Sequence, residues 1–141
     1  MSKRAIRAAA IAGAVVLASV LVVSVAAAYK TGRYEGTTSQ DEAVAFKAKN
    51  RGVKKLHFTM VIPCEDGSAY DITGVDGEAP TNDKGKFTAR YTPAPGSTTT
   101  FTSVVKGKLK RKRGEGTIKT EGSGESGVAC AGSVDWSAKK Q

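Results

Sequence analysis

The most concentrated set of functional groups in this sequence is a run of six cations within eight residues: Lys106, Lys108, Lys110, Arg111, Lys112 and Arg113. In an extended strand, lysines at alternate positions share one face, and the cations that follow them are expected in the next turn. We call these six residues the basic ridge. Such a ridge attracts polyanions, and binding would weaken steeply with salt because each neutralised anion releases counterions. The alternative is a solubilising face whose lysines protect a sheet edge from pairing with another chain.

A second group of charged residues consists of five acids within 14 residues: Glu65, Asp66, Asp71, Asp76 and Glu78. A Ca²⁺ ion needs several converging oxygen ligands, but these acids lack the Asp-x-Asp-x-Asp-Gly order of a dedicated calcium loop. We therefore expect solvated acids around a hairpin. The sequence predicts no metal site and no other cofactor.

Groups able to catalyse a reaction are scarce. His57 is the only histidine, so neither a His-based triad nor a multi-His metal site can form within one chain. Ser126 follows Gly124 and precedes Gly127, but Val128 stands where a nucleophile elbow needs its second glycine. No pair of facing buried carboxylates is visible either. We predict no catalytic residues and a protein that is not an enzyme.

The N-terminus has the pattern of an export signal. Lys3, Arg4 and Arg7 precede an uncharged run over 8–28, which ends in three alanines that suit signal peptidase. We predict a signal peptide over 1–28 and a secreted domain over 29–141. The run is also close to the ~20 residues needed to span a membrane, so an uncleaved anchor at the outer face of the membrane is the alternative. Membrane contact is predicted through this segment only.

Export has consequences for the rest of the chain. The first 28 residues hold three of the 22 basic residues and none of the 13 acidic ones, so 29–141 keep a net charge of +6. Outside the reducing cytosol we expect a disulfide between Cys64 and Cys130. Closing a loop of about 65 residues should stabilise the fold by roughly 4 kcal/mol.

The elements that must position these groups are short strands. Apolar and polar residues alternate in segments separated by Gly, Pro, Asn and Asp, which is typical of β-structure. The expected strands cover 33–38, 43–49, 53–64, 69–74, 86–91, 99–109, 114–121 and 128–138. Short connections favour antiparallel neighbours. The predicted fold is all-β: a single antiparallel domain of about eight strands, a meander closed into a barrel or folded into a sandwich.

Strand phase also predicts the core. In 53–64 the even positions from Leu56 to Cys64 are inward, while His57 is outward. In 128–138, Cys130 and Trp136 are inward, so both cysteines face the core. Every aromatic residue of the strands falls on the inner phase, which packing explains. A barrel of eight strands can also hold one small ligand, so an apolar ligand near Trp136 is a second functional hypothesis.

The order of several landmarks resembles a known group of proteins. The landmarks are 34–40 (YEGTTSQ), Leu56-x-Phe58, 64–67 (CEDG), Cys130-x-Gly132 and Trp136-x-Ala138. This pattern is similar to that of small exported actinobacterial proteins, β-rich with two cysteines and largely uncharacterised. The resemblance implies the fold and export for the chain beyond residue 28. It carries no catalytic or binding residue across.

The partner is predicted from charge and compartment. No aromatic residue lies in 102–135, and single-stranded nucleic acids bind aromatic platforms, so nucleic acid is not expected. An anionic cell-envelope polymer or an acidic protein fits an exported basic domain better. The sequence therefore predicts an exported binding or structural module of the envelope, with the basic ridge as its contact surface.

Overall fold

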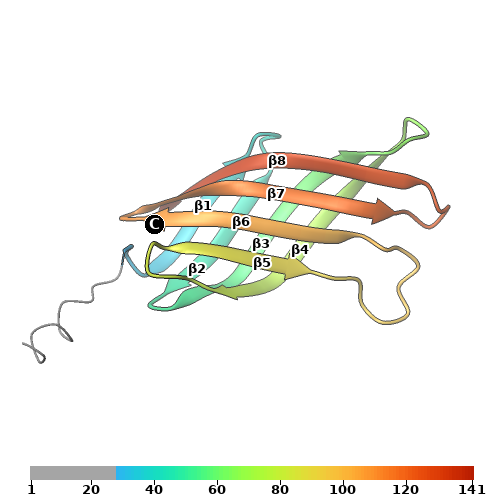
Figure 1. The fold of residues 1–141 in the computed structure, drawn as a ribbon. Coiled ribbons are helices and arrows are strands. Elements are labelled where there is room, and N and C mark those ends of the chain that lie inside the picture. The colour runs from blue at the N-terminus through green and yellow to red at the C-terminus, as the bar shows by residue number, and fades with distance from the viewer. Residues whose placement is uncertain (1–27) are drawn as a thin grey trace, which may run out of the picture.

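The computed structural model describes residues 28–141, which form eight antiparallel strands in one nearly closed, barrel-like sheet (Figure 1). The strands are β1 (Gly32–Thr38), β2 (Ala43–Lys49), β3 (Gly52–Pro63), β4 (Ala69–Pro80), β5 (Lys86–Tyr91), β6 (Thr102–Lys110), β7 (Arg113–Ser123) and β8 (Ala129–Lys140). The all-β antiparallel prediction is confirmed, and the barrel-like form is the one observed. The predicted segment 1–28 lies, apart from Ala28, outside the described residues. Within 28–141 no helix is long and apolar enough to cross a membrane.

The sheet is a meander whose first and last strands pair with each other. Its order is β4-β3-β2-β1-β8-β7-β6-β5, so every neighbouring pair is consecutive in the chain except β1 and β8. In that ladder Gly36 lies opposite Ala138, and Thr38 lies opposite Trp136. The remaining seam runs between β4 and β5, which end the sheet on either side. The N-terminal and C-terminal strands therefore lie in the middle of the sheet and not at its edges.

The seam between β4 and β5 is filled by a side chain. Tyr91, at the end of β5, donates a hydrogen bond from its hydroxyl to the Leu56 carbonyl at 2.6 Å, and its ring packs edge-on against Phe58 at 5.2 Å. β4 leaves room for this ring with glycine, since a Cβ at Gly77 would collide with the Tyr91 hydroxyl. Tyr91 thus joins the two sides of the seam through packing and one hydrogen bond.

Bulges on β3 and β4 explain where the predicted strands differ from the observed ones. Lys55 (φ 52°) and Asp76 (φ 54°) both have left-handed backbone, and the β3–β4 register shifts beside them. The extra residue in β3 turns both Val53 and Leu56 inward, although strict alternation places them on opposite faces. The prediction that the fourth strand ends at residue 74 was wrong, because β4 continues through its bulge to Pro80.

Aromatic side chains fill the interior near the start of β1. Phe46 stacks on Tyr34 at 5.1 Å and meets the edge of Trp136 at 5.7 Å, and Phe87 lies 6.1 Å from Trp136. The indole Nε1 donates to the Lys106 carbonyl at 3.1 Å. Gly107 lies against the same ring, and a Cβ there would come within 2.6 Å of both aromatic neighbours. The inward phase predicted for these aromatics is confirmed.

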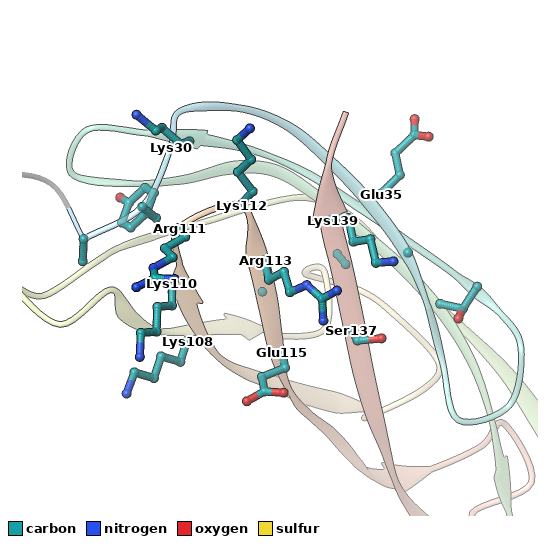
Figure 2. A pocket seen from close by; sticks show the side chains of 16 residues that line it. Lys30, Glu35, Lys108, Lys110, Arg111, Lys112, Arg113, Glu115, Ser137 and Lys139 are labelled. Atoms are coloured by element: carbon teal, nitrogen blue, oxygen red, sulfur yellow. The ribbon is translucent and has the colours of Figure 1, made fainter.

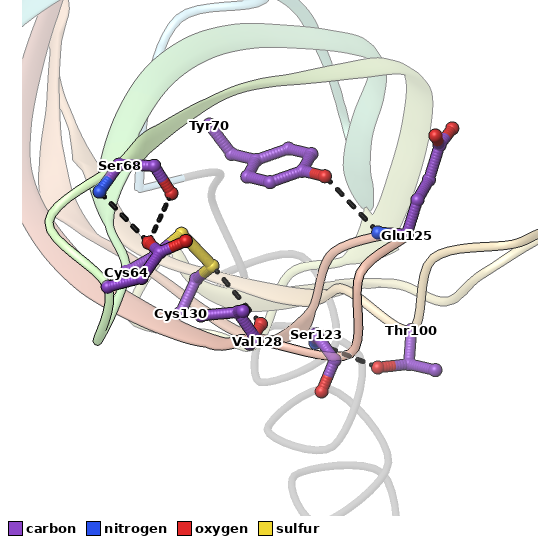
Figure 3. The surroundings of a disulfide bond; sticks show 9 residues. Cys64, Ser68, Tyr70, Thr100, Ser123, Glu125, Val128 and Cys130 are labelled. Atoms are coloured by element: carbon purple, nitrogen blue, oxygen red, sulfur yellow. Dashed lines mark hydrogen bonds between the residues drawn. A yellow bond between two sulfur atoms is a disulfide. The ribbon is translucent and has the colours of Figure 1, made fainter.

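The predicted disulfide is present and joins two strands that are not neighbours in the sheet (Figure 3). Cys64 directly follows β3 and Cys130 is the second residue of β8, and the two residues form a single antiparallel bridge. β1 and β2 have seven residues each, whereas β3 and β8 have 12, so the long strands extend past the short ones and meet. Beyond the end of β1, the Gln40 side chain pairs with β3 instead. Its Nε2 donates to the Val61 carbonyl and its Oε1 accepts from the Val61 N–H, both at 2.8 Å.

Removing the disulfide should destabilise the fold. The bridge closes a loop with a sequence separation of 66, so Cys64→Ala/Cys130→Ala should lower the free energy of unfolding by roughly 4 kcal/mol. Urea denaturation with and without reductant measures this. Reductant should lower the free energy of unfolding of the natural protein by the same amount and leave that of the double variant unchanged. Equal stability of the oxidised protein and the variant would contradict the prediction.

Alkaline pH should weaken the fold through Tyr91. Burial raises the pKa of Tyr91 above its ordinary value of 10.0, while the unfolded chain ionises near that value. Above pH 10 the unfolded chain therefore binds fewer protons than the folded one, and the free energy of unfolding falls as pH rises. Tyr91→Phe should cost about 1 kcal/mol at neutral pH and make the alkaline fall shallower. Urea titrations across this pH range test it, and an unchanged alkaline slope would refute it.

Candidate anion-binding surface

Cations of three adjacent strands line up across the outer face of the sheet. In the ladder, Lys110 of β6 lies opposite Arg113 of β7, which lies opposite Lys139 of β8. All three side chains point outward and are exposed. Residues directly opposite in an antiparallel pair have Cβ atoms about 5 Å apart, so this row places three positive charges side by side. Like charges in this arrangement repel one another, and a bound anion would relieve the repulsion.

Lys106 and Lys108 extend the positive surface along β6. Lys108 lies opposite Glu115, and Lys106 lies opposite Thr117. We call the outward cations of this region the basic wall; its members are Lys106, Lys108, Lys110, Arg113 and Lys139. A shallow groove of about 1290 Å³ runs over the end of the wall, with Lys30 on its rim and Glu35 and Glu115 also lining it (Figure 2). The surface is therefore strongly positive but holds two carboxylates.

The turn between β6 and β7 is fixed by the first residues of the barrel. Arg111 has left-handed backbone (φ 58°), and its N–H donates to the Ala28 carbonyl at 3.1 Å. The Lys30 N–H donates to the Arg111 carbonyl at 2.7 Å. The Tyr34 hydroxyl also contacts the Lys30 carbonyl at 2.7 Å, and burial raises the pKa of this phenol. The cations of the turn thus project from a rigid backbone.

No cation of the basic wall forms a salt bridge within residues 28–141, although Glu35 lies opposite Lys139 and Glu115 lies opposite Lys108 in the strand ladders. Among residues 28–141 one ion pair forms, between Arg33 and Glu35 at 2.6 Å, and the His57 Nε2 lies 3.8 Å from an Asp76 carboxylate oxygen. Glu35 lines the groove, but its oxygen is held by Arg33. No cation of the wall or of the turn lies within salt-bridge distance of an acid in the described part of the chain. Their charge is available to a partner.

Figure 2 shows that the structure brings most of the predicted ridge together and adds to it. Lys108, Lys110, Arg111, Lys112 and Arg113 line the one groove. Lys106 lies farther along, in a neighbouring hollow. Arg113 was predicted in the turn, but it is the first residue of β7.

The sequence did not indicate two further cations of the groove. Lys30 and Lys139 lie far from the ridge in the chain and also line the groove. Lys139 has an outward phase in its strand, but only the β7–β8 pairing brings it beside Arg113.

The five acids clustered between Glu65 and Glu78 and the single histidine lie away from the groove. Within the described residues, no three His, Cys, Asp or Glu side chains are grouped so that they could hold a metal ion. Asp66 lies in the turn between β3 and β4, where the hydroxyl and backbone N–H of Ser68 lower the pKa of its carboxyl. His57 is exposed on β3, on the outward phase that the sequence predicted. These groups do not converge on the basic wall.

Comparisons with protein-family models, curated proteins and solved structures found no match to this chain.

The row of like charges should cost the fold stability. Arg113→Gln removes the middle charge, so the free energy of unfolding should rise by up to about 1 kcal/mol at low salt. The gain should disappear at high salt, because exposed charges are screened. Lys119→Gln is the matched control, because Lys119 is also outward on β7 but lies opposite Val104 and Ser133. Urea denaturation at two salt concentrations measures the free energy of unfolding of both variants. An equal gain in both would argue against repulsion within the row.

Proposed function

We propose that this protein is an exported, non-catalytic β-barrel module of the cell envelope that binds an anionic polymer through its basic wall. The observation that carries the proposal is the row of Lys110, Arg113 and Lys139, which stand in register without a carboxylate within salt-bridge distance. Neighbouring strands are about 4.8 Å apart, so the row offers a charge to successive anionic groups of a chain laid across it. An acidic protein is the other partner class for the same surface.

Export is the part of the proposal that concerns location. The Cys64–Cys130 disulfide is compatible with an extracellular protein. The basic residues and uncharged run at the N-terminus support export from the sequence side. Secretion after cleavage, or anchoring at the outer face of the membrane, both bring the barrel to the anionic polymers of the envelope.

A small ligand inside the barrel is the alternative, and the packing supports it less. The predicted position was beside Trp136, where Phe46, Phe87 and the backbone of Gly107 occupy the space around the indole. The groove over the wall and the hollow beside it are lined largely by outward side chains. The outer surface therefore offers more room for a partner than the site near Trp136.

Binding to polyphosphate and to a carboxylate polymer, measured over a range of salt concentrations, tests the polymer proposal. The wall variant Lys108→Gln/Lys110→Gln/Arg113→Gln/Lys139→Gln should bind more weakly. Its plot of log affinity against log salt should be shallower by about 3, since each neutralised anion contributes about 0.7 for a flexible polyanion.

The matched control is Lys54→Gln/Lys55→Gln/Arg90→Gln/Lys119→Gln, which removes the same charge from other parts of the barrel. The control should keep the salt slope of the natural protein. Equal losses of affinity in both variants would mean that net charge alone drives binding. An unchanged affinity of the wall variant would show that the basic wall is not the binding surface. Denaturation curves of both variants confirm that they remain folded.

A further inference from the structure

The connections at one end of the barrel are mostly basic, and those at the other end are acidic. At the end where β1, β3, β5 and β7 begin, the connecting residues carry five exposed cations: Lys30, Arg51, Lys84, Arg111 and Lys112. The same connections hold one acid, Asp83. We call these five cations the end face. They come from four separate places in the chain, and the antiparallel meander gathers them at one end (Figure 1).

The connections at the opposite end carry the reverse charge. They hold five acids and, among the described residues, no cation: Asp41, Glu42, Glu65, Asp66 and Glu125. The barrel is therefore polarised along its strands. In front of an anionic surface, such a distribution turns the end face toward the surface. The 12-residue strands are roughly 40 Å long, which is several Debye lengths at physiological salt, so the acidic end is screened from that surface.

The chain enters the barrel at the end face, and its first residues are built into it. The Tyr29 side chain is buried, and its hydroxyl donates to the Lys49 carbonyl at 2.6 Å and pairs with the Thr81 hydroxyl at 2.8 Å. The Ala28 carbonyl accepts from Arg111 at 3.1 Å. The uncharged run over 8–28 thus ends on the end face without a spacer. Wherever that run enters a bilayer, the five cations are held at the headgroups.

We propose that the end face docks on anionic phospholipid headgroups, so that the barrel stands end-on with its basic end at the membrane and its acidic end outward. Lysine and arginine near an anionic bilayer each strengthen association roughly fivefold. The backbones of the segments that carry the five cations are hydrogen-bonded, so little backbone ordering accompanies contact. Lys30, Arg111 and Lys112 of the end face also line the groove over the basic wall, whereas Arg51 and Lys84 do not. None of the five is a member of the wall, so the proposal does not depend on polymer binding at the wall. The wall then remains open to the side, above the membrane.

Lysine reactivity in the full chain tests this arrangement. The protein is reconstituted in phosphatidylcholine vesicles with or without phosphatidylglycerol, acetylated briefly, and the modification at each lysine is measured by mass spectrometry. Phosphatidylglycerol should lower the reactivity of Lys30, Lys84 and Lys112 several-fold. Lys54, Lys55 and Lys119 are internal controls on the barrel sides and should not change.

Salt and the pattern of protection make the test decisive. At about 0.5 M salt the Debye length falls to roughly 4 Å, so the protection of the end face should be lost. Protection that is equal in both kinds of vesicle would reflect tethering alone and overturn the proposal. Protection of Lys106 and Lys108 in place of the end-face lysines would make the lipid a ligand of the basic wall, and would also overturn it. Uniform reactivity of all lysines would do the same.

Discussion

The ladder between β1 and β8 joins the beginning and the end of the domain in the middle of the sheet, and several features depend on it. It puts β8 between β7 and β1, so Lys139 has Arg113 of β7 on one side and Glu35 of β1 on the other, and the row of cations ends there. It also brings residues 28–30 beside the turn between β6 and β7, where the Lys30 N–H donates to the Arg111 carbonyl and the Arg111 N–H donates to the Ala28 carbonyl. Because β1 is short, β8 passes beyond it and meets β3 at the disulfide. The charged surface and the covalent bridge thus lie at opposite ends of the same strand.

The two ends of the barrel are built differently. At the basic end, aromatic rings and the hydroxyls of Tyr29 and Tyr34 hold the turns through backbone carbonyls. At the other end, the Cys64–Cys130 bridge joins β3 and β8 where they extend beyond the shorter β1 and β2, and Tyr70 packs on Phe101 at 5.1 Å. Burial and hydrogen bonds therefore fix the end that presents cations, whereas a covalent bond fixes the acidic end. A partner at the basic end meets a surface that is already ordered, which lowers the entropic cost of binding.

Much of the fold could be predicted because alternation of apolar and polar residues is a local signal. All eight strands were located, and both cysteines were placed inward, since each depends only on neighbours in the chain. The continuation of β4 to Pro80 was missed because the bulge at Asp76 breaks the alternation that marks a strand. The basic ridge was visible as a run, but Lys139 and Lys30 were not. The register of β7 with β8 brings Lys139 beside Arg113, and the contact of residues 28–30 with the β6–β7 turn brings Lys30 there. The choice of a barrel over a sandwich depends on the long-range pairing of β1 with β8.

The pairing of β1 with β8 also sets an order of assembly. The two strands are about as far apart in the chain as the domain permits, and contacts of this kind form slowly because a long loop must close first. A chain that appears from its N-terminus can form the β1–β4 meander early, while the outer edge of β1 has no partner until β8 exists. Open strand edges are sites of pairing with other chains. β1 is only seven residues long and carries Arg33 and Glu35 on its outward face. Both features limit pairing with other chains until β8 is available.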